Sequence, residues 1–160
     1  MSFQRILVPV DYSPHSELAV RTAASLAALY RASMTLVHVY LPPISALPGG
    51  FVFQSEPEVD WVFAKLGSYL GALAEKARAA GAANVATRIV MGAPATALCD
   101  LASDERFDLM VMGTHGRTGL NHALLGSVAE RVARLAPCPV LTVRALQESE
   151  SSAACARSAE

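Results

Sequence analysis

The sequence predicts an α/β fold, an open five-stranded parallel sheet with helices on both faces, of the Rossmann-like type. Short β-branched apolar runs without alternation, typical of strands buried on both faces, recur along the chain. Segments with helical spacing of apolar residues lie between several of these runs, an order typical of parallel sheets. The 160 residues, 52% hydrophobic and 17% charged, suffice for one domain with one core and exclude general disorder.

The first strand and helix are signalled by consecutive residues near the start. The run Arg5–Val10 predicts a buried strand that ends at Asp11. Ser13 is a favourable N-cap and Pro14 suits the first helical position, so we expect a helix from Pro14 onward. Residues 34–40 predict the second strand.

Residues 41–57 have a different character, with four of the nine prolines and the pair Gly49-Gly50. We expect an unusually long, flexible loop there, and loops of that length are commonly functional or disordered. Helical spacing resumes from about Val59 to Ala80, and Gly81 is suited to the position after a helix end.

The second half supplies three more strands. Residues 85–90 alternate apolar and polar side chains like an edge strand, and a short helix is expected over 94–103. Strands are expected over 109–112 and 140–143, with a helix over 127–135 between them. Residues 145–160 are rich in Ser, Ala and Glu without a period, so we expect a disordered tail after a domain that spans 1–144.

Charge and cysteine usage exclude several classes of function. Thirteen basic and fourteen acidic residues give a net charge of −1, so we expect no general attraction for nucleic acid or an anionic membrane. No apolar run approaches the roughly 20 residues that span a bilayer, and the start lacks the features of a signal peptide. Three cysteines without a Cys-x-x-Cys pair indicate reduced thiols in the cytoplasm. No histidine or cysteine pair has metal-ligand spacing, so no metal site is expected.

Unusual residues follow two of the predicted strands, where ligands bind in open α/β sheets. Pro9-Val10-Asp11 ends the first strand, and a glycine-rich segment, 113–119, follows the fourth. Gly126-Ser127 then opens a helix. Glycines allow backbone amides to approach an anion, and a helix N-terminus offers unpaired N–H groups, so this constellation predicts a phosphate site.

Positive charge gathers in the same part of the chain. Four arginines and one acid, Glu130, lie between residues 113 and 144; the arginines are at 117, 131, 134 and 144. Only His115 and Arg117 lie inside the glycine-rich segment, and we expect these two to contribute side chains to the phosphate site. The spacing is neither that of a Walker loop nor that of a dinucleotide fingerprint.

The spacing Gly113-x2-Gly116-x9-Gly126-Ser127 resembles that of the ATP-binding members of the universal stress protein family. The strings around 6–13, 111–130 and 138–143 are similar to the family's in the same order, and the resemblance covers about residues 3–144.

The resemblance implies an adenine-nucleotide alpha hydrolase-like sheet with ATP across the strand ends and a homodimer formed through residues 140–143. Mg²⁺ would ride on the phosphates, with Asp11 near it. Adenine and ribose would lie against the strand ends and the phosphates against the glycine-rich segment. The ATP-binding residues implied are Pro9, Val10, Asp11, Val39, Met112, Gly113, His115, Gly116, Arg117, Gly126, Ser127 and Val128.

Several of these residues also have ordinary structural interpretations. Ser127 and Glu130 have the spacing of a capping box, and Asp11 suits a turn in which it accepts from its own backbone. His38 is interpreted as a hydrogen-bonded histidine within a strand, and Cys99 and Cys138 as small core residues. Cys155 lies in the expected tail.

Three functions stay open. The first is an ATP-binding regulatory module of the stress response, and the second an interaction module of the same fold that binds no nucleotide. The third, an adenylating enzyme, is disfavoured because no glycine follows the first strand. No Gly-x-Ser-x-Gly elbow and no base for ATP hydrolysis are identifiable, so binding is favoured over catalysis, with slow hydrolysis left open.

Overall fold

Five parallel strands form one sheet in the order β5-β2-β1-β6-β7. The computed structural model describes residues 2–42, 45–47, 50–52, 56–114 and 126–144. The α/β fold class and the edge position of the third predicted strand are confirmed, and the fifth strand lies at the other edge. The strands are β1 (Arg5–Pro9), β2 (Ser33–Tyr40), β5 (Asn84–Met91), β6 (Leu109–Gly113) and β7 (Val140–Val143).

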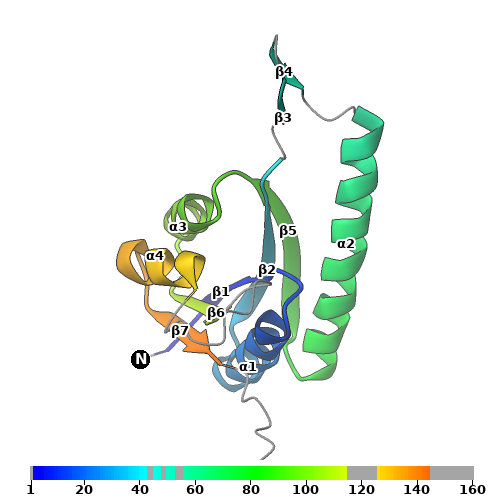
Figure 1. Cartoon of the computed structure of the whole chain (residues 1–160). Coiled ribbons are helices and arrows are strands. Elements are labelled where there is room, and N and C mark those ends of the chain that lie inside the picture. Colours follow the sequence, from blue (N-terminus) through cyan, green and yellow to red (C-terminus); the bar gives the residue numbers. More distant parts are fainter. Residues whose placement is uncertain (1, 43–44, 48–49, 53–55, 115–125, 145–160) are drawn as a thin grey trace, which may run out of the picture.

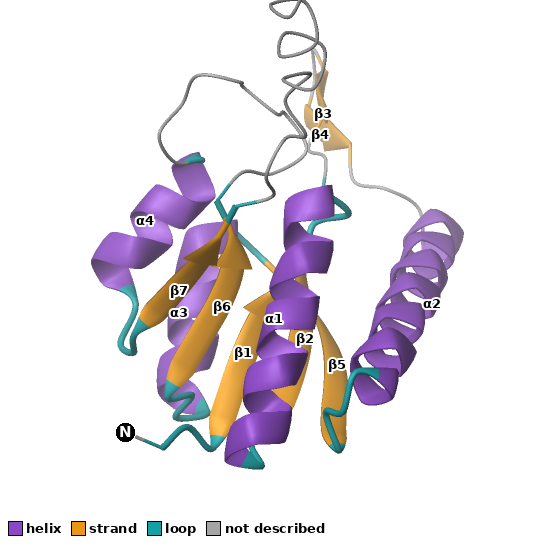
Figure 2. Cartoon of the chain, turned by 90° about the horizontal axis from the view of Figure 1, so that it is seen from below, coloured by secondary structure: helices purple, strands orange, loops and turns teal. Residues whose placement is uncertain are grey.

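Two helices cover each face of the sheet (Figures 1 and 2). Helices α1 (Pro14–Tyr30) and α2 (Glu56–Ala79) lie on one face, and α3 (Pro94–Asp104) and α4 (Ser127–Leu135) on the other. No helix among the described residues is long and apolar enough to cross a membrane.

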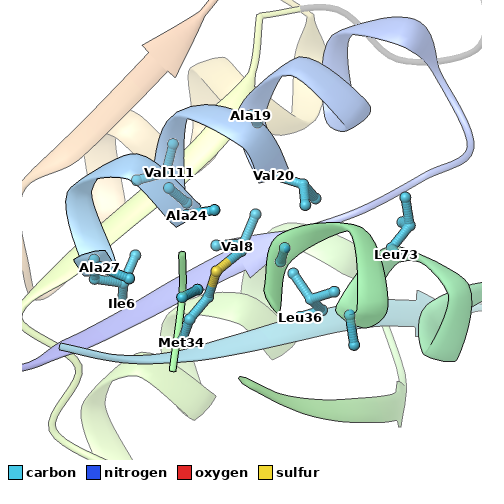
Figure 3. Packing of buried hydrophobic residues seen from close by; sticks show 14 of the residues in the cluster. Ile6, Val8, Ala19, Val20, Ala24, Ala27, Met34, Leu36, Leu73 and Val111 are labelled. Carbon is cyan, nitrogen blue, oxygen red and sulfur yellow. The ribbon is translucent and has the colours of Figure 1, made fainter. Parts of the chain in front are cut away.

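The core consists of one apolar cluster on each face, and β1 contributes to both. Ile6 and Val8 pack under α1 and α2, where Figure 3 shows Ile6 beside Ala27 and Val8 beside Ala24. Leu7, between them in sequence, points the other way and joins the cluster under α3 and α4. Because successive strand residues face opposite sides of a sheet, burial on both faces produces the apolar run without alternation.

The ends of α1 and α2 follow the signals in the sequence. Ser13 caps α1, its Oγ accepting from the Ser16 amide at 3.1 Å. At the end of α2, Gly81 has a φ of +104° and donates its N–H to Arg78 O at 2.9 Å, while Ala82 N donates to Ala77 O at 3.1 Å. This pair of hydrogen bonds is a Schellman motif, which requires the left-handed conformation that glycine adopts readily.

The expectation of a long loop over residues 41–57 needs correction. The segment contains two short antiparallel strands, β3 (Ser45–Leu47) and β4 (Gly50–Val52), in a separate sheet. Pro48 and Gly49 lie between them in sequence, and such a pair is typical of turns. Helix α2 begins at Glu56 rather than near Val59, because a proline at position 57 is tolerated in a first helical turn.

The topology determines where a ligand site can form. From β1 the chain proceeds to β2 and β5 on one side of the sheet, and afterwards to β6 and β7 on the other. The segments that leave β1 and β6 therefore diverge at the same edge. Such a switch point creates a crevice beyond the carboxyl ends of the strands.

Candidate functional site

A pocket of about 290 Å³ lies at this switch point. This volume is at the lower end of the range for small-molecule sites. Of the predicted ATP-binding residues, nine line it: Pro9, Val10, Asp11, Val39, Met112, Gly113, Gly126, Ser127 and Val128. His115, Gly116 and Arg117 lie outside the described residues.

The turn after β1 forms one wall through consecutive side-chain hydrogen bonds. Ser13 donates its backbone N–H and its hydroxyl to Asp11 Oδ1, at 3.1 and 2.6 Å. The Ser13 hydroxyl oxygen in turn accepts from the amide of Ser16, which also lines the pocket. The turn interpretation of Asp11 is therefore confirmed, and the same bonds fix its carboxylate at the pocket wall.

His38 of β2 adds a polar group to the pocket that sequence reasoning did not assign to the site. Its Nδ1 lies 2.8 Å from the carbonyl oxygen of Val10. A carbonyl only accepts, so Nδ1 carries the proton in this bond. The expectation of a hydrogen-bonded strand histidine is confirmed, and the bond joins β2 to the turn that holds Asp11.

The opposite wall is the N-terminus of α4, where the predicted capping box does not form. Gly126, not Ser127, is the N-cap, and glycine has no side chain with which to cap the helix. Ser127 is the first helical residue, and the Glu130 side chain accepts from Arg134 at 2.8 Å instead of reaching back. Within the described part of the chain, no side chain accepts from the amides of this first turn, which lies at a positive helix end.

A second helix N-terminus borders the same pocket. Ala93, the N-cap of α3, has no side chain able to cap, and Pro94 and Leu98 of this helix line the pocket. Proline at the first helical position has no N–H, so this helix end offers fewer donors than α4 does. No local pattern in residues 94–103 indicated that α3 would reach the site. The other lining residues missed by sequence reasoning are Ser16, Val37, His38, Thr114 and Ala129.

Gly113, predicted to contact phosphate, also meets a packing requirement. A Cβ atom built there would lie 2.8 Å from His15 Cβ and 3.0 Å from the His15 carbonyl carbon. The missing side chain therefore permits the end of β6 to approach the start of α1. Close packing between the end of β6 and the start of α1 therefore requires a glycine at this position.

Charge in the described lining is sparse. Asp11 is the one formally charged side chain among the described residues that line the pocket. Three of the arginines expected to attract phosphate, at 131, 134 and 144, do not line it. Within the described part of the chain, no three acidic, histidine or cysteine side chains group as metal ligands.

The two described cysteines are half-buried, free thiols. Burial, followed by the negative charge of Asp100, raises the pKa of the Cys99 thiol; burial, followed by Asp108, raises that of Cys138. A thiol with a raised pKa is a poorer nucleophile at neutral pH. These shifts agree with the interpretation of both as core residues, and Cys138 packs against the cluster under α3 and α4.

Comparison with known proteins identifies the family of this chain. Residues 2–144 match the sequence model described as the universal stress protein family. The chain belongs to the universal stress protein family. A relative from Methanocaldococcus jannaschii, universal stress protein MJ0531, is 33% identical over 145 residues, covering 89% of this chain and 82% of that protein.

Solved structures of the family share the fold. Universal stress protein UspA from Lactobacillus plantarum superimposes with a TM-score of 0.78 at 25% identity, over 90% of this chain and 99% of that one. A universal stress protein crystallised in complex with cAMP gives a TM-score of 0.69 at 31% identity, over 90% and 98% of the two chains. The chain therefore has the same overall fold as these two solved structures.

Proposed function

We propose that this universal stress protein binds ATP in the switch-point pocket and acts as a nucleotide-dependent module of the stress response. The observation that carries the proposal is the uncapped N-terminus of α4 in the pocket wall. Backbone N–H groups at a helix start, together with the helix dipole, form a ready site for phosphate. The family member that binds cAMP, at 31% identity, supports an adenine nucleotide as the ligand.

The residues that line the pocket support one orientation of the nucleotide. Apolar residues from three strand ends, Val10, Val39 and Met112, suit a flat base, and Ser127 and Val128 lie where phosphates would be held. Asp11 lies among the strand-end residues and suits a hydroxyl-bearing sugar, because an ionised carboxylate accepts hydrogen bonds.

The residues present fit a Mg²⁺ ion carried by the nucleotide rather than one held by the protein. Asp11 is the one carboxylate among the described lining residues, and its Oδ1 already accepts two hydrogen bonds from Ser13. Mg²⁺ commonly binds through substrate phosphates with one or two carboxylates and retained waters. When bound it would neutralise phosphate charge, and Asp11 would be its protein contact.

We propose binding rather than catalysis as the activity. A base that activates water needs a free oxygen close to the terminal phosphate. Asp11 is the one carboxylate among the described residues of the pocket, and its Oδ1 already accepts two hydrogen bonds from Ser13. A carboxylate oxygen that the turn already engages in this way supports binding rather than catalysis, and with it a regulatory role.

We further propose a cytoplasmic homodimer that pairs through β7. The strand is at the sheet edge, and Leu141 within it is 39% exposed. An edge strand with apolar exposure is a template for pairing with a second copy. The uneven number of cysteines and the two free thiols support a reducing compartment.

Gly126→Asp tests the phosphate site. Gly126 has φ −66° and ψ 150°, a conformation that any residue adopts. Aspartate is a better N-cap than glycine, so the nucleotide-free protein should be as stable or slightly more stable. Its charge would repel phosphate, so ATP-Mg²⁺ affinity should fall at least about tenfold. Thermal shift and titration calorimetry measure the two effects.

Gly126→Asn is the matched control, because asparagine caps equally well without the charge. It should bind ATP more tightly than the aspartate variant. Equal affinity of Gly126→Asp and wild type would place the phosphates elsewhere. No shift of the wild type by ATP, ADP, AMP or cAMP would instead support an interaction module without nucleotide.

A further inference from the structure

Tyr12, in the turn between β1 and α1, has an unusual backbone. Its φ is +69°, in the left-handed region that bulky residues rarely adopt. Such a conformation costs free energy and persists only where surrounding contacts enforce it, most often near functional sites. The neighbouring residue, Asp11, lines the nucleotide pocket.

Two aromatic contacts hold the Tyr12 ring. It stacks on Tyr69 of α2, with ring centroids 3.9 Å apart and an interplanar angle of 21°. It also meets the His38 ring edge-on at 5.3 Å and 77°. Tyr69 itself does not line the pocket, whereas His38 does. The three rings therefore connect α2 to the pocket wall.

The turn that these rings hold carries the polar groups of the pocket wall. The Val10 carbonyl accepts from His38, Asp11 accepts from Ser13, and the Ser13 hydroxyl accepts from the Ser16 amide. A change in the φ of Tyr12 would redirect the backbone on either side of it. The backbone conformation of Tyr12 therefore bears on where the Asp11 carboxylate and the start of α1 lie.

The phenol hydroxyl of Tyr69 adds nothing to this arrangement. Its oxygen is buried and has no hydrogen-bond partner among the described residues. The Ser16 hydroxyl is nearby but donates to the carbonyl of Ser13 at 2.9 Å. Burial, followed by the charge of Glu17, raises the pKa of the Tyr69 phenol, so it stays neutral. The ring is therefore what Tyr69 contributes.

We propose that Tyr69 is a positioning residue for the nucleotide site: from a helix outside the pocket, its ring holds Tyr12, and through it Asp11, in the binding conformation. This inference rests on the proposed function, since it concerns the same pocket. It also makes nucleotide binding and the packing of α2 interdependent, because such coupling is reciprocal.

The test compares Tyr69→Ala with Tyr69→Phe in the full chain. The alanine variant removes the stack, and we expect ATP-Mg²⁺ to bind about threefold to tenfold more weakly by calorimetry, in line with the strength of aromatic pairs. Hydrogen exchange at the amides of Ser13 and Ser16 should accelerate without nucleotide. Phenylalanine keeps the ring, so both quantities should match wild type.

Three outcomes overturn the proposal: unchanged affinity and exchange in Tyr69→Ala, a lower melting temperature with unchanged affinity, or a phenylalanine variant as weak as alanine. Should Tyr69→Ala not fold, Tyr12→Ala, at a residue 39% exposed, must give the same losses and Tyr12→Phe must not. A wild type that binds no nucleotide overturns the proposed function, while the exchange measurement still decides whether Tyr69 fixes the turn.

Discussion

At the scale of single residues, Gly113 determines how closely the end of β6 approaches the start of α1. Gly113 ends β6 beside the first turn of α1, and the atoms that a Cβ would meet include the backbone of His15. A flexible side chain could rotate away, but backbone atoms move only with the helix. The position therefore tolerates no side chain without a shift of α1 or β6.

Gly113→Ala should lower the free energy of unfolding by about 1–3 kcal/mol, the usual cost of overpacking. The displaced wall carries Asp11 and Ser16, so ATP affinity should also fall. Urea denaturation and calorimetry measure these changes.

Gly67→Ala is the matched control for Gly113→Ala, because a Cβ there meets nothing within 4 Å. Alanine in this helical position should raise stability by up to about 1 kcal/mol. If Gly113→Ala proves as stable as wild type, the close approach to His15 does not constrain the fold.

At the scale of elements, the helices differ in how the hydrogen-bonding groups at their ends are satisfied. Helix α1 is capped by a side chain, and α2 ends in a Schellman motif. At the start of α4 the N-cap is a glycine, which has no capping side chain, and Glu130 accepts from Arg134 instead of reaching back. An exposed, unsatisfied helix end beside a pocket is the arrangement that leaves donors for a ligand.

The start of β1 depends on a carboxylate from the other side of the switch point. Asp108, just before β6, accepts from the amides of Gln4 and Arg5 at 2.7 and 3.0 Å. The side chain thereby aligns β1 with β6 at the end of the sheet opposite the pocket.

Asp108→Ala should reduce the free energy of unfolding by about 1–3 kcal/mol, because two strand amides lose a charged acceptor. ATP affinity should stay within twofold, since the pocket lies at the other end of the strands. Chemical denaturation with and without nucleotide checks both. A large loss of affinity at unchanged stability would contradict this role.

At the scale of the whole molecule, the two edges of the sheet differ. Edge strand β5 is paired with β2 along eight residues and has several exposed polar side chains. Edge strand β7 is only four residues long, and all four side chains are at least partly exposed. An apolar edge of this kind favours association with a second copy.

Leu141→Lys together with Val143→Lys should convert the proposed dimer to a monomer, because lysines on an edge strand disfavour pairing. Light scattering with size-exclusion chromatography measures the mass. Thr87→Lys and Ala86→Lys on β5, both exposed, form the control pair and should leave the mass unchanged. A dimer that persists in the β7 variant refutes pairing through this edge.

Local signals predicted most elements because they depend on neighbouring residues only. Ser13-Pro14 marks the start of α1 and Gly81 the end of α2, since caps and positive φ are local requirements. Burial on both faces is likewise visible in the apolar run of β1. The hairpin within 41–57 was missed because the prolines and glycines of a turn are equally typical of a loop.

The sequence by itself determined the fold class, the family and the strand ends that carry the site, because periodicity, caps and glycine spacing are properties of short segments. Only the tertiary structure decided what meets across the pocket: His15 against Gly113, Tyr69 against Tyr12, and α3 at the rim. Ser127 also illustrates the difference. It would cap α4 only if the helix began one residue later, but Ser127 is itself the first helical residue. Contacts between segments that are distant in the sequence depend on how the helices pack on the sheet, and no pattern within a short segment encodes that packing.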